Sequence, residues 1–229
     1  YTVPKLSDIL IRTSEELDIF DSPLLLSRNE DMSGMQRFLK RMLDVICSGV
    51  GLVVLSPFFL LVALSIYLTD RGPVFYKQTR LTKGGKEFQI CKFRTMIQNA
   101  EEKSGARLAS EHDDRILPVG HFLRRTRLDE LPQLFNILAG QMSVVGPRPA
   151  LWNQADLIAE RDKYGANALV PGLTGYAQVN GRDELPIPVK AELDGYYAAH
   201  VNFVLDMKIF FKTIFNVLAG RGVVEGGTQ

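Results

Sequence analysis

The longest apolar stretch of the sequence runs from Val45 to Leu68 and contains no charged residue. As a straight helix, a run of roughly 24 residues would reach about 36 Å at 1.5 Å per residue. The hydrocarbon core of a bilayer is only about 30 Å thick. The pattern therefore predicts a helical segment that is long enough to enter or cross a membrane.

Two features of this run argue against a straight transmembrane helix. Ser56-Pro57 lies at its centre, where proline removes a backbone hydrogen bond and favours a kink. Basic residues flank both ends, whereas the positive-inside rule concentrates them on one side. We therefore predict a re-entrant helix-break-helix over residues 35–71, with both ends at the cytoplasmic face. A kinked transmembrane helix and a buried core helix are the alternatives. The flanking basic residues are Arg37, Lys40 and Arg41 before the run and Arg71, Lys77, Arg80 and Lys83 after it.

Beyond residue 72 the pattern changes from helical to alternating. Residues 73–78 and 87–93 predict two strands of a hairpin, joined by a loop that holds Gly84-Gly85. The remaining pattern is helical, and the fold class is therefore α+β and mostly helical. The expected helices are a polar one at 96–103, one that begins near Asp129, and three at 151–164, 189–200 and 203–218.

The last of these helices is apolar around much of its circumference. Lys208 and Lys212 lie four residues apart and form a basic edge. Such a helix is suited to the interface of a membrane, and we predict interfacial amphipathic helices around the candidate site. A core helix with one basic edge fits the same pattern.

The first 34 residues mix short apolar runs with acidic and turn residues, and they lack the continuous apolar core of a signal peptide. We interpret residues 1–34 as a linker or the tail of an upstream region. Residues 35–71 form the predicted re-entrant helix, and residues 72–229 form a domain on the cytosolic face.

Overall charge and cysteine content exclude several classes of function. The chain has 27 Lys and Arg against 26 Asp and Glu, so a net charge of +1 gives no reason to expect nucleic acid as a partner. Cys47 and Cys91 show neither the spacing of a metal site nor a disulfide framework. A reducing, cytosolic setting fits best.

A basic cluster leads directly into a pair of carboxylates, Asp129 and Glu130. Because proline is tolerated only in the first turn of a helix, Pro132 predicts that both carboxylates sit at a helix N-terminus. The free N–H groups and the helix dipole there favour an ionised carboxylate and also a bound phosphate. The alternative is that Asp129 simply caps the helix. The basic cluster consists of Arg124, Arg125 and Arg127.

Two loops add candidates for phosphate binding. Prolines on both sides of Arg148 stiffen residues 146–149, so its guanidinium is offered as a bidentate phosphate donor from a fixed position. Residues 170–182 are rich in glycine and side-chain donors, as loops that closely approach a phosphate or a nucleotide must be. Each loop alone would also fit an ordinary surface turn.

The order and spacing of these segments make the combination specific. From Arg37 to about Val223 the chain strongly resembles the bacterial sugar transferases that act on polyprenyl phosphate, the monotopic phosphoglycosyl transferases. Residues 72–229 would then be the catalytic domain. The matching segments are Lys40-Arg41-Met42-Leu43-Asp44, Ser56-Pro57, Gly72-Pro73-Val74-Phe75, Lys92-Phe93-Arg94-Thr95-Met96, Leu128-Asp129-Glu130-Leu131-Pro132-Gln133, Gly146-Pro147-Arg148-Pro149, Pro171-Gly172-Leu173-Thr174-Gly175, Gln178-Val179-Asn180-Gly181-Arg182 and Leu205-Asp206-Met207-Lys208.

This resemblance implies a mechanism. In the family the first carboxylate of the acidic pair, here Asp129, is understood to attack the sugar-linked phosphate of the donor and release the nucleoside monophosphate. The phospho-sugar aspartyl intermediate would then pass its phospho-sugar to the lipid phosphate. Glu130 takes the family's place for holding Mg²⁺ or moving a proton. Asp206 is the next candidate for a metal ligand, with Asp194 behind it.

The resemblance also implies the remaining site residues and the partners. The donor would be a UDP-sugar, which releases UMP, and the acceptor undecaprenyl phosphate. The reaction would be the first membrane step of polysaccharide, exopolysaccharide or glycoconjugate synthesis, among the lipids of the bacterial inner membrane and on its cytoplasmic face. Longer relatives suggest a homodimer. The expected phosphate contacts are Lys92, Arg94, Arg124 and Arg148, and the expected substrate pocket holds Thr174, Gln178, Asn180, Arg182 and Asp194.

Two other functions use the same features. A membrane-anchored, metal-dependent nucleotide-sugar hydrolase would pass the phosphoryl unit to water and would need no lipid acceptor. A membrane scaffold for sugar-assembly proteins would show no turnover and would tolerate changes at Asp129.

Overall fold

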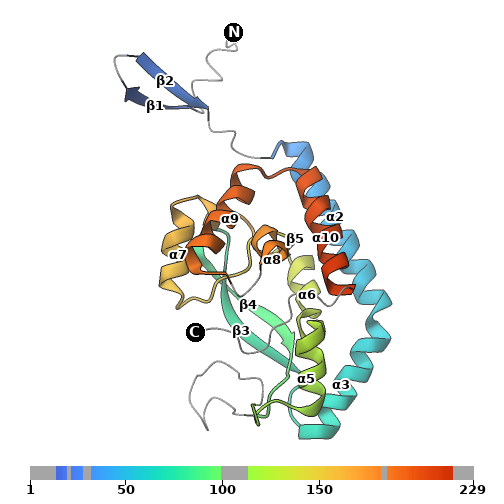
Figure 1. Cartoon of the computed structure of the whole chain (residues 1–229). Coiled ribbons are helices and arrows are strands. Elements are labelled where there is room, and N and C mark those ends of the chain that lie inside the picture. The colour runs from blue at the N-terminus through green and yellow to red at the C-terminus, as the bar shows by residue number, and fades with distance from the viewer. Residues whose placement is uncertain (1–13, 20–21, 28–31, 99–112, 182–184, 219–229) are drawn as a thin grey trace.

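The computed structural model describes residues 14–19, 22–27, 32–98, 113–181 and 185–218. Figure 1 shows a body built mostly of helices, with three separate two-stranded sheets among the described residues, so the predicted α+β, mostly helical class is confirmed. The strands are β1 (Ser14–Ile19), β2 (Ser22–Ser27), β3 (Phe75–Thr82), β4 (Lys86–Phe93), β5 (Ser143–Val145) and β6 (Gly172–Thr174). The α-helices are α2 (Gly34–Val54), α3 (Ser56–Asp70), α5 (Pro118–Thr126), α6 (Gln133–Leu138), α7 (Ala155–Asp162), α8 (Tyr176–Asn180), α9 (Ile187–Ala199) and α10 (Phe203–Leu218), and the 3₁₀ turns are η1 (Lys83–Gly85), η2 (Leu128–Glu130) and η3 (Ala166–Ala168).

Helices α2 and α3 form the apolar run and meet at the predicted break. Ser33 begins α2 with a capping box, in which its hydroxyl accepts from the Gln36 N–H. The two helices are bent by 60° at the Ser56-Pro57 junction, and the Ser56 hydroxyl donates to the carbonyl of Val53 at 2.8 Å. No single helix among the described residues has the length and apolar character to cross a membrane, whereas this bent pair together does.

Strands β3 and β4 form the predicted hairpin, which is longer than the sequence suggested. Phe75 pairs with Phe93 at one end and Thr82 with Lys86 at the other. Gly84 and Gly85 take φ values of +69° and +72° in the connecting turn, a backbone conformation that glycine adopts without steric penalty.

Two of the predicted helices were wrong in extent. Residues 96–98, the described part of the predicted polar helix at 96–103, are not helical, because Met96 forms a β-bridge with Ile116. The remainder of that prediction lies outside the described residues. The helix predicted at 151–164 is limited to α7, since Leu151 instead forms a bridge with Arg80 of the hairpin.

Strands β5 and β6 pair in parallel. β5 leads into the predicted loop at residues 146–149, and β6 lies within the predicted loop at residues 170–182. A Cβ atom on Gly172 would lie 2.1 Å from the Gly146 backbone nitrogen, and one on Gly175 would lie 2.1 Å from the Gly146 carbonyl oxygen. These glycines therefore allow two loops to pack backbone against backbone. The sequence had indicated a close approach to a ligand instead.

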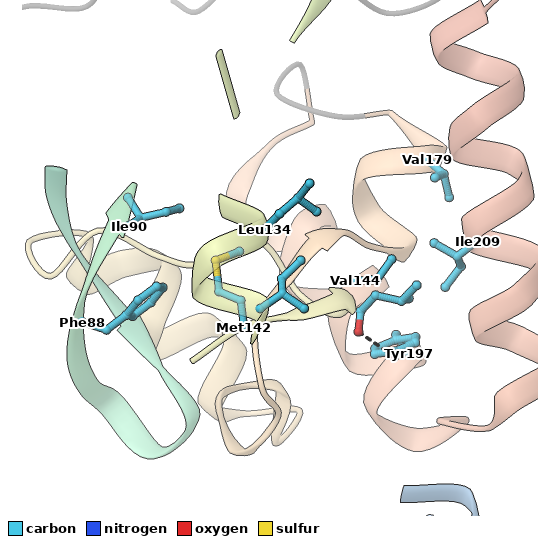
Figure 2. Close-up of a cluster of buried hydrophobic side chains, with 10 residues drawn as sticks. Phe88, Ile90, Leu134, Met142, Val144, Val179, Tyr197 and Ile209 are labelled. Carbon is cyan, nitrogen blue, oxygen red and sulfur yellow. Dashed lines mark hydrogen bonds between the residues drawn. The ribbon is translucent and has the colours of Figure 1, made fainter. Parts of the chain in front are cut away.

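The main hydrophobic core joins the hairpin to the helices. Figure 2 shows side chains of β4, α6, β5, α8, α9 and α10 converging from both sides of this cluster. Ile137 and Ile209 are almost fully buried in it, so α6 and α10 are fixed relative to β5. A second cluster, around Leu123 and Phe93, packs α3 against α5 and β4. Together they hold the segment between α5 and α6 in one position.

Helix α10 has the range that the sequence predicts, and it has one face buried in the core and another apolar face exposed. Its inner face buries Asp206 and Ile209 against the core, while Phe211 and Phe215 are more than 60% exposed on its outer face. In Figure 1 it lies beside α2, and contacts between the two helices agree with this view.

Candidate active site

The two carboxylates lie in a tight turn between α5 and α6. Arg127 adopts a left-handed conformation with φ of +58°, uncommon for a residue other than glycine. It ends α5 and starts η2, which carries Asp129 and Glu130. The predicted helix N-terminus is therefore displaced: α6 begins only at Gln133, and its cap residue is Pro132 rather than Asp129. Both carboxylates are less than 10% exposed.

Glu130 is held by three cationic side chains. Lys92 Nζ and Arg148 Nη2 each lie 2.9 Å from its Oε1, and Arg127 Nη1 lies 3.9 Å away. Burial raises the pKa of Glu130, but Arg148, Lys92 and Arg127 outweigh that effect and hold it well below its usual range. Glu130 is therefore an ionised anchor that fixes the positions of two cations.

Asp129 has the opposite electrostatic character. Among the described residues, its buried Oδ1 has no hydrogen-bond partner, which is rare for a buried polar atom. Burial and the neighbouring Glu130 raise its pKa to about 6, against the opposing charges of Lys92, Arg127 and Arg124. At neutral pH this carboxylate is mostly ionised, poorly solvated and close to several cations, which are the properties of an activated nucleophile.

The loop that carries Arg148 is fixed through its backbone. Arg80 of β3 donates to the carbonyl of Pro149 at 3.0 Å, and Arg161 of α7 donates to the carbonyl of Arg148 at 2.9 Å. The Arg148 guanidinium reaches both oxygens of Glu130, at 2.9 and 3.4 Å. The stiff loop predicted from its prolines thus presents Arg148 to the site.

The structure brings together only some of the predicted substrate residues. Thr174 and Gln178 line a cavity that also contains Glu130 and Arg148. Asn180 instead accepts a hydrogen bond from Lys212 of α10 at 2.6 Å and is exposed. Arg182 lies outside the described residues.

Two arginines predicted as phosphate contacts have protein partners. Arg124 donates from Nε to the Thr95 hydroxyl at 2.9 Å, and its charge reaches Asp129. Arg94 is buried and lies 3.2 Å from Asp70 at the end of α3. A Cβ on Gly72 would collide with the Arg94 guanidinium, at 2.2 Å from Nη1. Arg94 therefore joins α3 to β4, and its phosphate role stays a prediction.

Two carboxylates predicted at the site are engaged elsewhere. Asp194 is 1% exposed and pairs with Arg161, whose Nε and Nη2 lie 2.9 and 2.5 Å from its Oδ2. Asp206 is also 1% exposed, and it accepts from Lys40 at one oxygen and from Tyr197 at the other, both at 2.6 Å. Desolvation makes a carboxylate require such partners. Both carboxylates therefore have structural partners, and the substrate contact predicted for Asp194 and the metal role predicted for Asp206 stay predictions.

With this geometry established, the chain can be compared with known proteins. The sequence model of the family described as bacterial sugar transferase matches residues 35–220. The chain belongs to the bacterial sugar transferase family. The motif resemblance is confirmed, and the matched range contains both carboxylates and the cations around them.

Individual relatives support the same family assignment. The exopolysaccharide production protein PSS of Rhizobium leguminosarum bv. phaseoli is 42% identical, over 82% of this chain and 100% of the relative. The UDP-N-acetylgalactosamine-undecaprenyl-phosphate N-acetylgalactosaminephosphotransferase of Aeromonas hydrophila is 39% identical over 83% of this chain. The UDP-glucose:undecaprenyl-phosphate glucose-1-phosphate transferase of Escherichia coli K12 is 36% identical over 86% of it. The chain spans about half the length of the last two, 46% and 47%.

Sequence reasoning missed the residues of α2 that fasten it to the site. Lys40 Nζ donates to the carbonyl of Val145 at 2.8 Å as well as to Asp206. Asp44 Oδ1 accepts from the Val144 N–H at 2.8 Å and from the Ser143 hydroxyl at 3.0 Å. Lys40 and Asp44 stood in a family-like segment of the sequence, but the pattern gave no sign that β5 was their partner. Lys40, one of the basic residues that flank the apolar run, thus also holds α2 against β5 and α10.

The residues around Asp129 bear on the predicted Mg²⁺. Within the described residues no group of three or more His, Cys, Asp or Glu side chains is arranged to hold a metal ion. Mg²⁺, however, is commonly bound by one or two carboxylates together with substrate phosphates and water. The unpartnered Asp129 oxygen beside Glu130 fits a site of that kind, which the phosphates of a substrate would complete.

Proposed function

We propose that this chain is the catalytic region of a polyprenyl-phosphate sugar-1-phosphate transferase that acts on a UDP-sugar and undecaprenyl phosphate. The observation that carries the proposal is the contrast between two adjacent buried carboxylates. Glu130 is neutralised by Lys92 and Arg148, whereas Asp129 has a raised pKa and an oxygen without a partner among the described residues. The family and the names of the two undecaprenyl-phosphate transferases support the same chemistry.

In the first half-reaction Asp129 is the nucleophile. Its carboxylate oxygen forms a bond to the phosphorus that carries the sugar, and the bond from that phosphorus to the oxygen of UMP breaks. UMP leaves with the bonding electrons, and a phospho-sugar remains on Asp129 as a mixed anhydride. Lys92, Arg127 and Arg148 lie where the negative charge of the phosphates would accumulate, so they stabilise its redistribution.

In the second half-reaction the lipid phosphate takes the place of UMP. One of its oxygens attacks the same phosphorus, and the bond to Asp129 breaks, which restores the carboxylate and yields a lipid-linked diphosphate-sugar. Glu130 stays ionised throughout, because three cations surround it, and it keeps Lys92 and Arg148 in position. Asp129 can therefore react first with the soluble nucleotide-sugar and then pass the phospho-sugar to the lipid phosphate.

Asp129, whose Oδ1 has no partner among the described residues, is the residue that would hold Mg²⁺ together with the donor phosphates, whereas both oxygens of Glu130 accept hydrogen bonds from Lys92 or Arg148. The ion would supply positive charge to the diphosphate and the leaving UMP. The protein residues bind and orient the phosphates, and the stiff loop at Arg148 keeps its guanidinium at the same place in both half-reactions.

The bent helix pair supports a position of the protein at the membrane surface. Large apolar side chains on both sides of the bend are more than half exposed, including Val50 and Val53 of α2 and Leu60 and Leu61 of α3. A surface of this kind marks a contact with another protein or a membrane. We propose that α2 and α3 enter the cytoplasmic leaflet as a re-entrant pair, so that the site lies where a lipid phosphate and a soluble nucleotide-sugar can both reach it.

An acceptor-dependence assay tests the proposal. The protein in nanodiscs is given a panel of UDP-sugars with and without undecaprenyl phosphate, and UMP is measured. The transferase predicts sustained UMP release only with the lipid, complete loss in Asp129→Asn, and near-normal activity in the exposed control Glu192→Gln. Sustained release without the lipid would identify a hydrolase. If no UDP-sugar is turned over although the protein folds normally, the membrane-scaffold function would be the remaining interpretation.

A further inference from the structure

A cavity of about 240 Å³ is lined by Glu130 and by residues of α10. Its lining combines two kinds of residue. Arg127, Glu130 and Arg148 are charged, and both arginine side chains are 31% exposed. Most of the remaining lining is apolar and comes from η2, β5, β6, α8 and α10, together with Leu131. Its apolar lining residues are Leu128, Leu131, Val144, Leu173, Val179, Phe210, Ile214 and Val217.

The polar groups of this cavity are few and mostly engaged. The hydroxyls of Thr174 and Thr213 bond each other at 2.7 Å, and Gln178 donates to the carbonyl of Leu173 at 3.2 Å. Among the described residues, the buried Oε1 of Gln178 has no partner, which leaves one free acceptor in the lining. A uridine or a hexose would need several free donors and acceptors here, because unpaired polar groups are costly to bury. The volume is also below the 300 Å³ or so at which pockets for drug-sized ligands begin. The cavity therefore does not suit a whole nucleotide-sugar.

The apolar lining of the cavity continues into the exposed surface of α10. Ile214 and Val217 line the cavity and are also 42% and 50% exposed. Their neighbours Phe211 and Phe215 face outward on the same helix and are 64% and 61% exposed. A lipid chain that begins at the arginines could thus leave the cavity at the exposed edge formed by Ile214 and Val217, whereas Phe211 is not part of the lining.

We propose that this cavity binds the first isoprenyl units of the lipid acceptor, with the acceptor phosphate at Arg127 and Arg148. The inference rests on the proposed function and adds to it the place and the residues that recognise the acceptor chain. Ile214 and Val217 contact the apolar chain, and Arg127 and Arg148 place its phosphate next to Glu130.

A cavity-filling variant tests this separately from the transferase activity itself. Ile214→Trp adds volume inside the cavity, while Phe211→Trp is a matched change on the outer side of the same helix. Each protein is assayed in nanodiscs with farnesyl phosphate and undecaprenyl phosphate as acceptors. Exchange of labelled UMP into the UDP-sugar reports the donor half-reaction, which needs no acceptor.

The proposal predicts that Ile214→Trp raises the KM for both acceptors by about tenfold, as expected if roughly two CH₂ groups lose their buried site. UMP exchange should change less than twofold, and Phe211→Trp should leave both quantities near wild type. An unchanged acceptor KM in Ile214→Trp would overturn the proposal, and an equal loss in Phe211→Trp would assign the effect to membrane seating instead.

Two further results also decide the matter. A raised KM for the UDP-sugar, with slow exchange, would show that the cavity serves the donor and would overturn the proposal. Absence of UMP exchange in the wild type would refute the proposed function, and this inference with it. If Ile214→Trp does not fold, Val217→Trp, at another residue that lines the cavity, replaces it. The same result is expected: a raised KM for the acceptors with nearly unchanged UMP exchange.

Discussion

Replacing Asp129, the proposed nucleophile, should stabilise the protein, which is unusual for a buried polar residue. The pKa of Asp129 is raised from 3.8 to about 6, so at neutral pH the folded state holds a carboxylate in a place that disfavours its charge. A shift of about two units corresponds to roughly 3 kcal/mol. Asp129→Asn removes the charge and keeps the shape, and we expect it to gain stability of that order at pH 8.

The sign of the pH dependence follows from linkage. Because the folded pKa is the higher one, the folded state binds the proton more tightly than the unfolded state between pH 3.8 and about 6. Relative to the variant, the wild type therefore loses stability as the pH rises through this window. The advantage of Asp129→Asn should be complete above pH 7, fall to about half at pH 5 and disappear below pH 4.

Thermal unfolding in nanodiscs at pH 5 and pH 8 measures this effect. For a domain of this size, about 3 kcal/mol corresponds to a rise in Tm of roughly 6–12 °C at pH 8. Glu192→Gln, a change at an exposed carboxylate, should shift Tm little at either pH. If Asp129→Asn is no more stable than wild type at pH 8, Asp129 is not electrostatically strained and the account of its activation is wrong.

Three further outcomes are expected. UMP exchange should fall about tenfold between pH 7 and pH 5, because a group with a pKa of about 6 passes from mostly ionised to mostly protonated; a flat profile would exclude Asp129 as the titrating nucleophile. Arg161→Leu should lower stability by about 3–5 kcal/mol by leaving Asp194 buried without its partner, and a second change, Asp194→Leu, should recover much of it in urea unfolding; an unrecovered double variant would contradict the pairing. Single cysteines at Met35 and at Lys83, in a cysteine-free background, should both resist a membrane-impermeant thiol reagent in intact cells if α2 and α3 form a re-entrant pair, and labelling of only one would indicate a true span.

Local patterns gave much of the fold because they depend on neighbouring residues. Alternation at residues 73–93 predicted the hairpin, and the range of α10 followed from its periodicity. The break at Ser56-Pro57 was also predicted, because a proline within a helical pattern acts on its own turn. The helix expected at 96–103 was wrong over its described part, residues 96–98, since Met96 pairs with Ile116, a contact that no local pattern encodes.

The candidate site was predictable in its chemistry and less so in its geometry. Asp129, Glu130, Lys92 and Arg148 were all named from the sequence, and in the structure Lys92 and Arg148 each lie 2.9 Å from Glu130. Charge type alone could not separate Asp206 from them, although it pairs with Lys40 of α2. Which carboxylate faces a site and which is paired within the core depends on packing between segments distant in the sequence.

The central claim is that Asp129 carries the phospho-sugar between donor and acceptor. Its most direct test uses a UDP-sugar labelled with ³²P on the phosphate next to the sugar. Without acceptor, the wild type should retain about one label per active site, on the peptide that contains Asp129, and should lose it to undecaprenyl phosphate when the lipid is added. The mixed anhydride should also be released by hydroxylamine. Lipid product formed at the normal rate while no label ever resides on Asp129 would contradict the account, because donor and acceptor would then react directly.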